Sequence, residues 1–475
     1  MPTIIDAKLQ NEVFRIVGET ADSMGLDVYV VGGYVRDIFL RRDSADIDFV
    51  TVGSGIELAK AVAARLGKKK RLAIYANYGT AQIAHQGMEL EFVGARRESY
   101  TRDSRNPIVE DGTLDDDQRR RDFTINAMAI CLNTDRFGQL VDPFGGIADL
   151  NAGIIRTPLD PDVTFSDDPL RMMRAIRFAT QLEFEILPAT FDGIRRNASR
   201  IEIISKERIN DELGKIMRSR RPSIGFRLLD ESGLLQLIMP ELHALKGVEA
   251  VGGRAHKDNF YHTLKVVDKV AARSDNEWLR WAALLHDIAK PVTKKWDNAQ
   301  GWTFHNHNFI GEKMVPVIFK KMKMPLNDKM KYVQKLVGLH MRPQQVGEEG
   351  VSDSGVRRLL TDAGDDVDDL MILAESDLTS GNPVKVRTAL EGFAALRQRM
   401  KEISAADDYR KWKNPIDGNE IMERLGIPPS QEISRLKQIV KDAILDGIIP
   451  NDHDAAWDYL VAHRSDGVTL SSDQA

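Results

Sequence analysis

Residues 28–51 read VYVVGGYVRDIFLRRDSADIDFVT, and this stretch decides the fold of the first part of the chain. Val28 to Val31 is a β-branched and aromatic run typical of a buried strand, and Gly32-Gly33 ends it before an amphipathic segment at Tyr34 to Leu40. A second strand is predicted at Asp46 to Val50. Because side chains alternate along a strand, the carboxylates of Asp46 and Asp48 face the same side of it. The pattern therefore predicts a strand, a glycine turn, a helix and a strand with paired carboxylates.

The chemistry that this stretch indicates is nucleotidyl transfer. Two neighbouring carboxylates repel each other unless a cation lies between them, and a divalent metal that prefers oxygen ligands neutralises both. The backbone N–H groups of Gly32 and Gly33, at the positive end of the following helix, could hold a triphosphate. Asp46 and Asp48 would then hold Mg²⁺ between that phosphate and an attacking hydroxyl. The alternative is a solvated turn with two surface aspartates, and the nearby glycine pair favours the metal site.

The length and composition of the chain restrict its class. A chain of 475 residues is too long for one core and predicts roughly three domains or more, at about 100–200 residues each. No apolar run approaches a membrane span, and the first residues lack the pattern of an export signal, so we expect no membrane partner. Cys131 is the only cysteine, which excludes an internal disulfide and a cysteine-built zinc site and fits a cytoplasmic location.

Charge gives a weaker indication of a partner. The formal net charge of −5 does not by itself indicate a nucleic-acid-binding protein. Basic runs occur at residues 68–71, 119–121 and 218–221, all in the first half of the chain. Each could be only a solvated face, but together they allow a basic surface near the glycine turn.

Strand and helix patterns continue to alternate after the opening stretch, so this part is predicted to be α/β. Further strands are expected at Ala73–Tyr75, Thr80–His85 and Leu90–Ala95. Glu91 lies between apolar neighbours in the last of these and either joins the metal site of the two aspartates or faces water. The polar segment that follows, Arg96 to Asp117, has a length at which a loop is suspected of function.

A cluster of polar side chains then precedes the apolar strand predicted at residues 127–132. Arg120 and Arg121 stand beside Asp122 and Asn126 in this cluster. Guanidinium groups bind phosphate oxygens in a bidentate manner, so these side chains suit triphosphate and ribose contacts.

The chain becomes mainly helical after residue 146. Asp168 precedes Pro169 at a helix start, where it could simply cap the helix. Asp168 and Arg171 also lie three residues apart, on one face of the first turn. A carboxylate acceptor beside a guanidinium donor matches the edge shared by cytosine and adenine, so this pair could select a base without a template.

A second group of candidate residues lies downstream. His262, the adjacent pair His286-Asp287 and the distant Asp377 supply the nitrogen and oxygen ligands of a divalent-metal hydrolase. A divalent transition metal held by them would lower the pKa of bound water. His307 and His340 are further candidate ligands.

The ordered motifs resemble those of class II tRNA nucleotidyltransferases and the related bacterial poly(A) polymerases. They are G-G-x-V-R-D at Gly32 to Asp37 with D-x-D at Asp46, then the motifs within residues 117–127, 142–146, 167–171 and 207–213. The downstream histidines and aspartates resemble an HD phosphohydrolase domain, which many bacterial CCA-adding enzymes carry. The similarity covers nearly the whole chain. One departure is Asp167, where the family more often has Glu.

The resemblance implies an α+β protein with a polymerase-β-type nucleotidyltransferase head at residues 1–150. A helical neck at 151–225, an HD-type body at 226–400 and a helical tail at 401–475 with a disordered end would follow. It also implies roles for individual residues. Asp46, Asp48 and Glu91 would be catalytic, and the nucleotide would be held by Gly32, Gly33, Arg36, Arg120, Arg121, Asp122, Asn126, Asp168, Arg171, Arg174 and Arg177.

The function implied is addition of CCA to the 3′ end of tRNA from CTP and ATP. The alternatives are a poly(A) polymerase, or an enzyme that adds only CC or only A. From another class, the chain could be mainly an HD metal-dependent phosphohydrolase whose head only binds nucleotide.

Overall fold

The structure, a computed structural model, describes residues 5, 8–67, 71–99, 108–248, 250–251, 254–255, 258–379, 382–406 and 409–464. These residues form two compact units, Met1–His243 and Ala244–Ala475, which are described separately. The end predicted to be disordered, from Ser465 on, and residues 100–107 of the polar segment lie outside the described residues.

The first unit begins with a seven-stranded mixed sheet in the order β3-β4-β5-β2-β1-β8-β9. Its central strands β2 and β5 are parallel, whereas β1 pairs antiparallel with β2 and with β8. The sheet strands are β1 (Val28–Val31), β2 (Asp46–Thr51), β3 (Leu72–Tyr75), β4 (Thr80–His85), β5 (Met88–Gly94), β8 (Ala129–Cys131) and β9 (Leu140–Val141). A separate antiparallel pair consists of β6 (Arg96–Ser99) and β7 (Ile108–Asp111), within the segment where only a loop was predicted.

Alternation along β2 separates the core from the candidate site. Ile47 and Phe49 are buried, and the Phe49 ring stacks on Phe92 of β5 with 4.8 Å between centroids. Asp46 and Asp48 occupy the intervening positions on the opposite face, as the period of two predicts.

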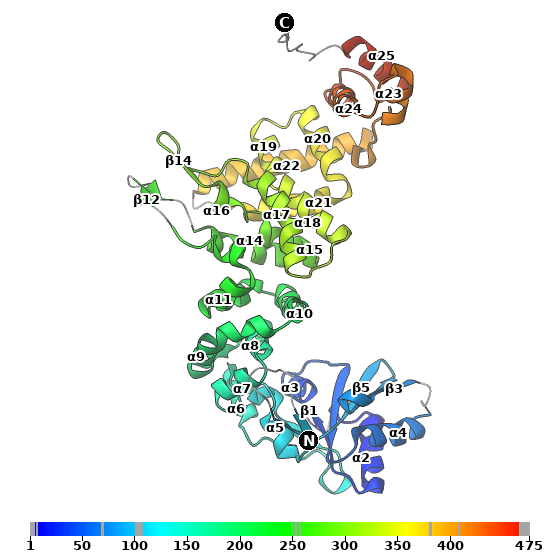
Figure 1. The fold of residues 1–475 in the computed structure, drawn as a ribbon, viewed down its shortest axis with the longest axis vertical. Helices are drawn as coiled ribbons and strands as arrows, with labels where there is room; N and C mark the ends of the chain where they lie inside the picture. The colour runs from blue at the N-terminus through cyan, green and yellow to red at the C-terminus, as the bar shows by residue number, and fades with distance from the viewer. Residues whose placement is uncertain are drawn as a thin grey trace. The chain divides into compact units, whose positions relative to one another are not determined.

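Helices cover this sheet, with α2 and α4 packed on each other and α3 against β1 and β2 (Figure 1). The helices of this part are α2 (Glu12–Met24), α3 (Gly33–Phe39), α4 (Gly55–Arg65), α5 (Leu114–Arg119) and α6 (Gly146–Ala152). This part therefore combines helices with a sheet, as the alternation of strand and helix patterns predicted.

The rest of the first unit is helical except for a short parallel pair, β10 (Ile154–Ile155) with β11 (Glu185–Ile186). Helix α8 packs against α10 and α11, and most of its residues are buried, which leaves its arginines few orientations. The helices are α7 (Pro161–Asp167), α8 (Leu170–Leu182), α9 (Pro188–Asn197), α10 (Lys206–Met217), α11 (Pro222–Glu231), α12 (Leu234–Ile238) and α13 (Pro240–His243).

The second unit is built from helices, with two small hairpins. In Figure 1, α14, α15, α17, α18 and α21 gather in one bundle, and their mutual contacts confirm this packing. Its helices are α14 (Asn259–Ala271), α15 (Glu277–Leu285), α16 (Lys290–Thr293), α17 (His307–Lys321), α18 (Asp328–Leu339), α19 (Arg342–Glu348), α20 (Asp353–Ala363), α21 (Val367–Asp377), α22 (Pro383–Ala406), α23 (Gly418–Leu425), α24 (Gln431–Leu445) and α25 (His453–His463). The hairpins pair β12 (Ala250–Val251) with β13 (Arg254–Ala255), and β14 (Lys295–Asp297) with β15 (Gly301–Thr303).

The last three helices have a core of their own. Ile421 of α23, Leu436 and Val440 of α24 and Leu460 of α25 are buried together. Among the described residues, no helix combines the length and the apolar character needed to cross a membrane.

Candidate active site

Three carboxylates meet on the solvent side of the central strands. Asp48 of β2 is in register with Glu91 of β5, and Asp46 lies two positions earlier on β2. All three line one cavity of about 680 Å³. Burial raises the pKa of Asp48 above its ordinary value and the charges of Glu91 and Asp46 raise it further, although Arg121 opposes them. Such crowding of anions fits a divalent cation with oxygen ligands.

The glycine turn gives the site space. Gly32 has a φ of +72°, and a Cβ added to it would lie 3.0 Å from Nη1 of Arg121 and 3.5 Å from Oδ2 of Asp48. A side chain here would therefore meet both the cation and the anion of the site. The N–H of Gly32 donates to the carbonyl of Met128 at 3.3 Å. It is therefore already bonded within the protein, whereas the sequence pattern predicted that it would hold a phosphate.

The two adjacent arginines share a buried anchor. Asp117, from α5, is fully buried and accepts hydrogen bonds from Nε of Arg120 at 2.9 Å and from Nε of Arg121 at 3.0 Å. Burial opposes ionisation, but the two guanidinium groups hold the pKa of Asp117 below its ordinary value. Arg121 lines the cavity and Arg120 does not.

Asp122 and Asn126 form a second hydrogen-bonded group at the wall of the cavity. Asn126 donates to Oδ1 of Asp122 at 3.1 Å and accepts from Nη1 of Arg36 at 3.0 Å. Arg174 of α8 donates from Nε to Oδ2 of Asp122 at 2.7 Å. These contacts bring together predicted nucleotide-binding residues from three separate parts of the chain.

Phe178 of α8 lies beneath three guanidinium groups. Their carbons are 5.1 Å (Arg36), 5.5 Å (Arg174) and 4.1 Å (Arg177) from the ring centroid. Burial lowers the pKa of Arg177 to about 10, and the buried Glu212 of α10, 2.9 Å away, opposes that shift. The positive charge gathered on one aromatic ring is suited to a triphosphate.

The proposed base-reading pair lies outside this cavity. Oδ1 of Asp168 accepts from the N–H of Leu170, the first residue of α8, at 3.1 Å, whereas the cap position of this helix is Pro169. The guanidinium of the buried Arg171 donates to the carbonyls of Thr164, at 3.3 Å, and Arg120, at 2.6 Å. Neither residue is among those that line the cavity.

Several residues of the cavity were not predicted from the sequence. Phe178, Lys215, Gln82 and Glu89 line it. The buried Glu212 of α10 pairs with Lys215 of the same helix at 3.0 Å. Glu212 also pairs with Arg177, which lies on α8. Only the burial of Glu212 could have indicated a partner on another helix.

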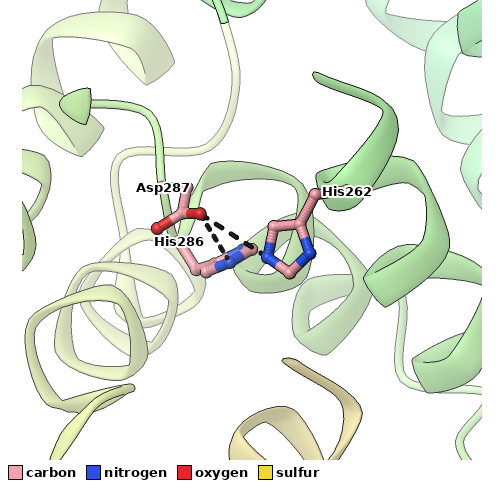
Figure 2. Close-up of side chains that lie close together, drawn as sticks. All are labelled: His262, His286 and Asp287. Carbon is pink, nitrogen blue, oxygen red and sulfur yellow. Dashed lines mark ion pairs between the residues drawn. The ribbon is translucent and has the colours of Figure 1, made fainter. Parts of the chain in front are cut away.

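The downstream candidates also converge. Nε2 of His262 lies 3.6 Å from Oδ2 of Asp287 and 2.8 Å from Oδ1 of Asp377, and Nε2 of His286 lies 3.3 Å and 3.5 Å from the same two atoms. Figure 2 shows His262, from α14, and His286 pointing toward the Asp287 carboxylate. Two overlapping groups of donors could each hold a metal ion: His262, His286 and Asp287, and Asp287, His307 and His340.

The charges of this cluster suit metal binding. Burial opposes the charged form of His286, but Asp287 and Asp377 raise its pKa to about 10. Burial lowers the pKa of His340 to about 4, so its imidazole is neutral and available as a ligand. Lys290 is 2.6 Å from Oδ2 of Asp287, and this contact places it at the centre rather than only at a helix end. A divalent ion bound here would displace protons from its ligands.

These geometries define two kinds of site: carboxylates on adjacent strands that face an arginine-lined cavity, typical of metal-dependent nucleotidyl transfer, and an HD-type histidine and aspartate centre. Comparison with family profiles agrees, since residues 28–156 match "Poly A polymerase head domain", 183–246 match "Probable RNA and SrmB- binding site of polymerase A" and 259–379 match "HD domain".

The chain is 35% identical over 306 residues to a multifunctional CCA protein of Shewanella frigidimarina, covering 62% of this chain and 68% of that protein. It is 32% identical over 340 residues to an A-adding tRNA nucleotidyltransferase of Deinococcus radiodurans, covering 70% and 75%. The chain belongs to the tRNA nucleotidyltransferase family.

Solved structures give the same result for the fold. A tRNA nucleotidyltransferase complexed with a primer tRNA and an incoming ATP analog is 26% identical, covers 80% of this chain and 98% of that one, and has a TM-score of 0.56. The Thermotoga maritima CCA-adding enzyme, at 21% identity and a TM-score of 0.60 over 97% of both chains, shares the fold. The α+β architecture and the family resemblance inferred from the motifs are confirmed.

Proposed function

We propose that this enzyme adds CCA to the 3′ end of tRNA from CTP and ATP. The observation that carries the proposal is the cavity in which Asp46, Asp48 and Glu91 face Arg121, Arg174 and Arg177. The 3′ oxygen of tRNA forms a bond to the α-phosphorus, and the bond from that phosphorus to pyrophosphate breaks. Mg²⁺ held by Asp46 and Asp48 would favour ionisation of the attacking hydroxyl and neutralise charge on the phosphate.

The arginines of the chain have the complementary task. The cations around Phe178 and the anchored Arg121 would hold the triphosphate and stabilise the negative charge that accumulates on the leaving pyrophosphate. They are held in place before substrate arrives by Asp117, Asp122 and Glu212, so little reorganisation is needed at the moment of reaction.

Base selection by Asp168 and Arg171 remains part of this proposal. For Arg171 to read a base, its guanidinium has to leave the carbonyls of Thr164 and Arg120. Nucleotide binding is therefore expected to be accompanied by a rearrangement at the start of α8, and this rearrangement has to precede recognition of the base by Arg171.

The proposal is tested with a tRNA series that ends before, within and after CCA. Each tRNA is incubated with CTP, ATP or both in the presence of Mg²⁺, and the products are resolved at single-nucleotide length. We expect two C residues and then one A, with no extension of tRNA-CCA. Long A tails made without incorporation of CTP would refute CCA addition.

A second candidate is addition of A alone to tRNA that already ends in CC. It is favoured by the A-adding tRNA nucleotidyltransferases among the similar proteins, including one from Aquifex aeolicus that is 42% identical over 198 residues. Incorporation of AMP into tRNA-CC, with no incorporation of CMP into the shorter tRNAs, would establish this function instead. In either case the tRNA substrate and the cysteine content favour a cytoplasmic enzyme.

The HD centre supports a separate metal-dependent phosphohydrolase activity, because four histidines and Asp287 can hold metal beside Lys290, and Asp377 lies 2.8 Å from His262. Asp48→Ala is expected to abolish nucleotide incorporation and preserve hydrolysis of a phosphomonoester or phosphodiester, and His286→Ala to do the reverse. Nucleotide transfer by Asp48→Ala at the wild-type rate would overturn the assignment of the head site.

A further inference from the structure

The cavity of the head has two walls of opposite character. Among the described residues, its cationic side chains come from α3, α8, α10 and the segment after α5, and they are Arg36, Arg121, Arg174, Arg177 and Lys215. Of the described residues on β4 and β5, those that line the cavity are Gln82, Glu89 and Glu91, none of which is a cation. The sheet order β4-β5-β2-β1 places Asp46 and Asp48 of β2 between the two walls, because β1 runs directly into α3.

The two walls suit different substrates. A triphosphate carries several negative charges, so it fits the arginine wall, whereas on β4 and β5 it would lie against Glu89 and Glu91. In an in-line displacement the attacking oxygen approaches the α-phosphorus from the side opposite to the leaving pyrophosphate. With the pyrophosphate held by the arginines, the 3′ oxygen of tRNA and its ribose would therefore arrive over β5 and β4.

Gln82 restrains the third carboxylate on this second wall. It lies directly opposite Glu91 in the antiparallel pair of β4 and β5, so the two side chains share one face of the sheet. Nε2 of Gln82 donates to Oε2 of Glu91 at 3.3 Å. Glu91 in turn lies beside Asp48 in the parallel register of β5 and β2. The amide thus holds Glu91 without adding a charge to a site that already contains several carboxylates.

The same face of the sheet is open beyond Gln82. Ala73 of β3 is the register partner of Gln82, and Ala84 lies two residues after Gln82 on β4, so both alanines face the same side. Both are exposed, and β3 is the edge strand of the seven-stranded sheet. Their methyl side chains leave space in which the end of an RNA could lie against β4 and β3.

We propose that Gln82 is a positioning residue of the transfer reaction, which holds Glu91 in place where the 3′ end of tRNA arrives, and that the surface around Ala73 and Ala84 accommodates that end. Glu91 is then oriented toward the terminal ribose rather than toward the triphosphate. The inference rests on the proposed addition of nucleotides to tRNA. It is tested on a single step, incorporation of AMP into tRNA-CC, which CCA addition and A addition share.

Two substitutions at Gln82 separate positioning from packing. Gln82→Ala removes one hydrogen bond to a charged group, so kcat is expected to fall about tenfold while the KM for ATP stays unchanged. Gln82→Glu keeps the size of the side chain but places a carboxylate against Glu91, so kcat is expected to fall further than in Gln82→Ala. A residue that only fills space would give the reverse order, with Gln82→Glu near wild type, and that order would overturn the proposal. Gln86→Ala, in the turn between the two strands and outside the cavity, is expected to leave kcat unchanged.

The path of the tRNA end is tested on β3. Ala73→Phe adds an aromatic side chain at an exposed strand position, which the fold tolerates, and it is expected to raise the KM for tRNA-CC severalfold without changing the KM for ATP. Ile74→Phe is the matched control, because Ile74 is adjacent and 46% exposed but lies on the opposite face of the strand, so neither KM should change. Equal effects of the two substitutions, or a rise in the KM for ATP alone in Ala73→Phe, would overturn the placement of the RNA end.

Failure of this inference is distinguishable from failure of the proposed function. If the wild-type protein incorporates no AMP into tRNA-CC, the proposed addition of the terminal A is refuted. If the wild-type protein incorporates AMP but the variants give the contrary results, only the role of Gln82 and the path of the RNA are refuted.

Discussion

Asp117→Asn removes a buried negative charge that anchors both Arg120 and Arg121. Asp117 has no exposed side-chain surface, and its two partners are 20% and 17% exposed. Removal of one partner from a buried ion pair lowers the free energy of unfolding by about 3–5 kcal/mol. Because the arginines are partly exposed, we expect a loss near the lower value, about 3 kcal/mol. At about 2–4 °C per kcal/mol for a unit of this size, Tm falls by about 6–12 °C.

The effect on function follows from the position of Arg121 in the cavity. Without its anchor, Arg121 keeps only a hydrogen bond to the carbonyl of Asn126 at 3.5 Å and its attraction to Asp48, so its position is less well fixed. The KM for ATP is therefore expected to rise more than kcat falls. Because the pKa of Asp117 is lowered in the fold, its stabilisation is complete at neutral pH and is lost as pH falls below the ordinary value of 3.8 and through the folded pKa.

The assay combines thermal unfolding at neutral pH with AMP incorporation at varied ATP. Asp115→Asn is the matched control, since Asp115 belongs to the same helix and pairs with Arg119, but both side chains are more than half exposed. We expect no measurable change for this control. If Asp117→Asn matches the control in both Tm and KM, the buried anchor has no role in holding the arginines.

Three further outcomes are expected. Asp48→Asn is expected to abolish nucleotide incorporation but to raise the free energy of unfolding measured in EDTA at neutral pH. Burial raises the pKa of Asp48, so its ionised carboxylate destabilises the metal-free fold, and the substitution removes that charge. A lower free energy of unfolding for the variant would contradict this reasoning. Gly32→Ala costs about 1–3 kcal/mol and raises the KM for ATP, whereas Gly25→Ala, at a similar φ with open space around it, leaves KM unchanged. Glu212→Gln shifts the alkaline loss of ATP binding to lower pH, since Arg177 is charged only below its pKa of about 10 and Glu212 raises that pKa; identical pH profiles would refute the link.

Local sequence pattern was sufficient to predict the strands that carry Asp46 and Asp48. The alternation at Asp46 and Asp48 placed both carboxylates on one face, and β1 and β2 begin at the predicted residues. The position of Glu91 was left open because its strand pattern did not say which strand it would pair with. The parallel register of β2 with β5 settles this by placing Glu91 beside Asp48.

Long-range packing decided what the sequence did not. Arg171 donates hydrogen bonds to backbone carbonyls of α7 and of the end of α5. No spacing within residues 167–171 indicates these acceptors. Likewise Phe178 was an ordinary apolar residue in the pattern of α8, and its position beneath three guanidinium groups depends on how α8 packs against α10 and against Phe123.

The repulsion between the guanidinium groups around Phe178 implies that a bound nucleotide stabilises the folded state. Arg174 and Arg36 each lower the pKa of Arg177, which shows that these like charges oppose one another in the free enzyme. A triphosphate relieves that opposition, and saturation at 100 times Kd adds about 2.7 kcal/mol to the stability of the folded state. The melting temperature of the head should therefore report nucleotide affinity directly, so that CTP, ATP, UTP and GTP can be ranked before any tRNA is added.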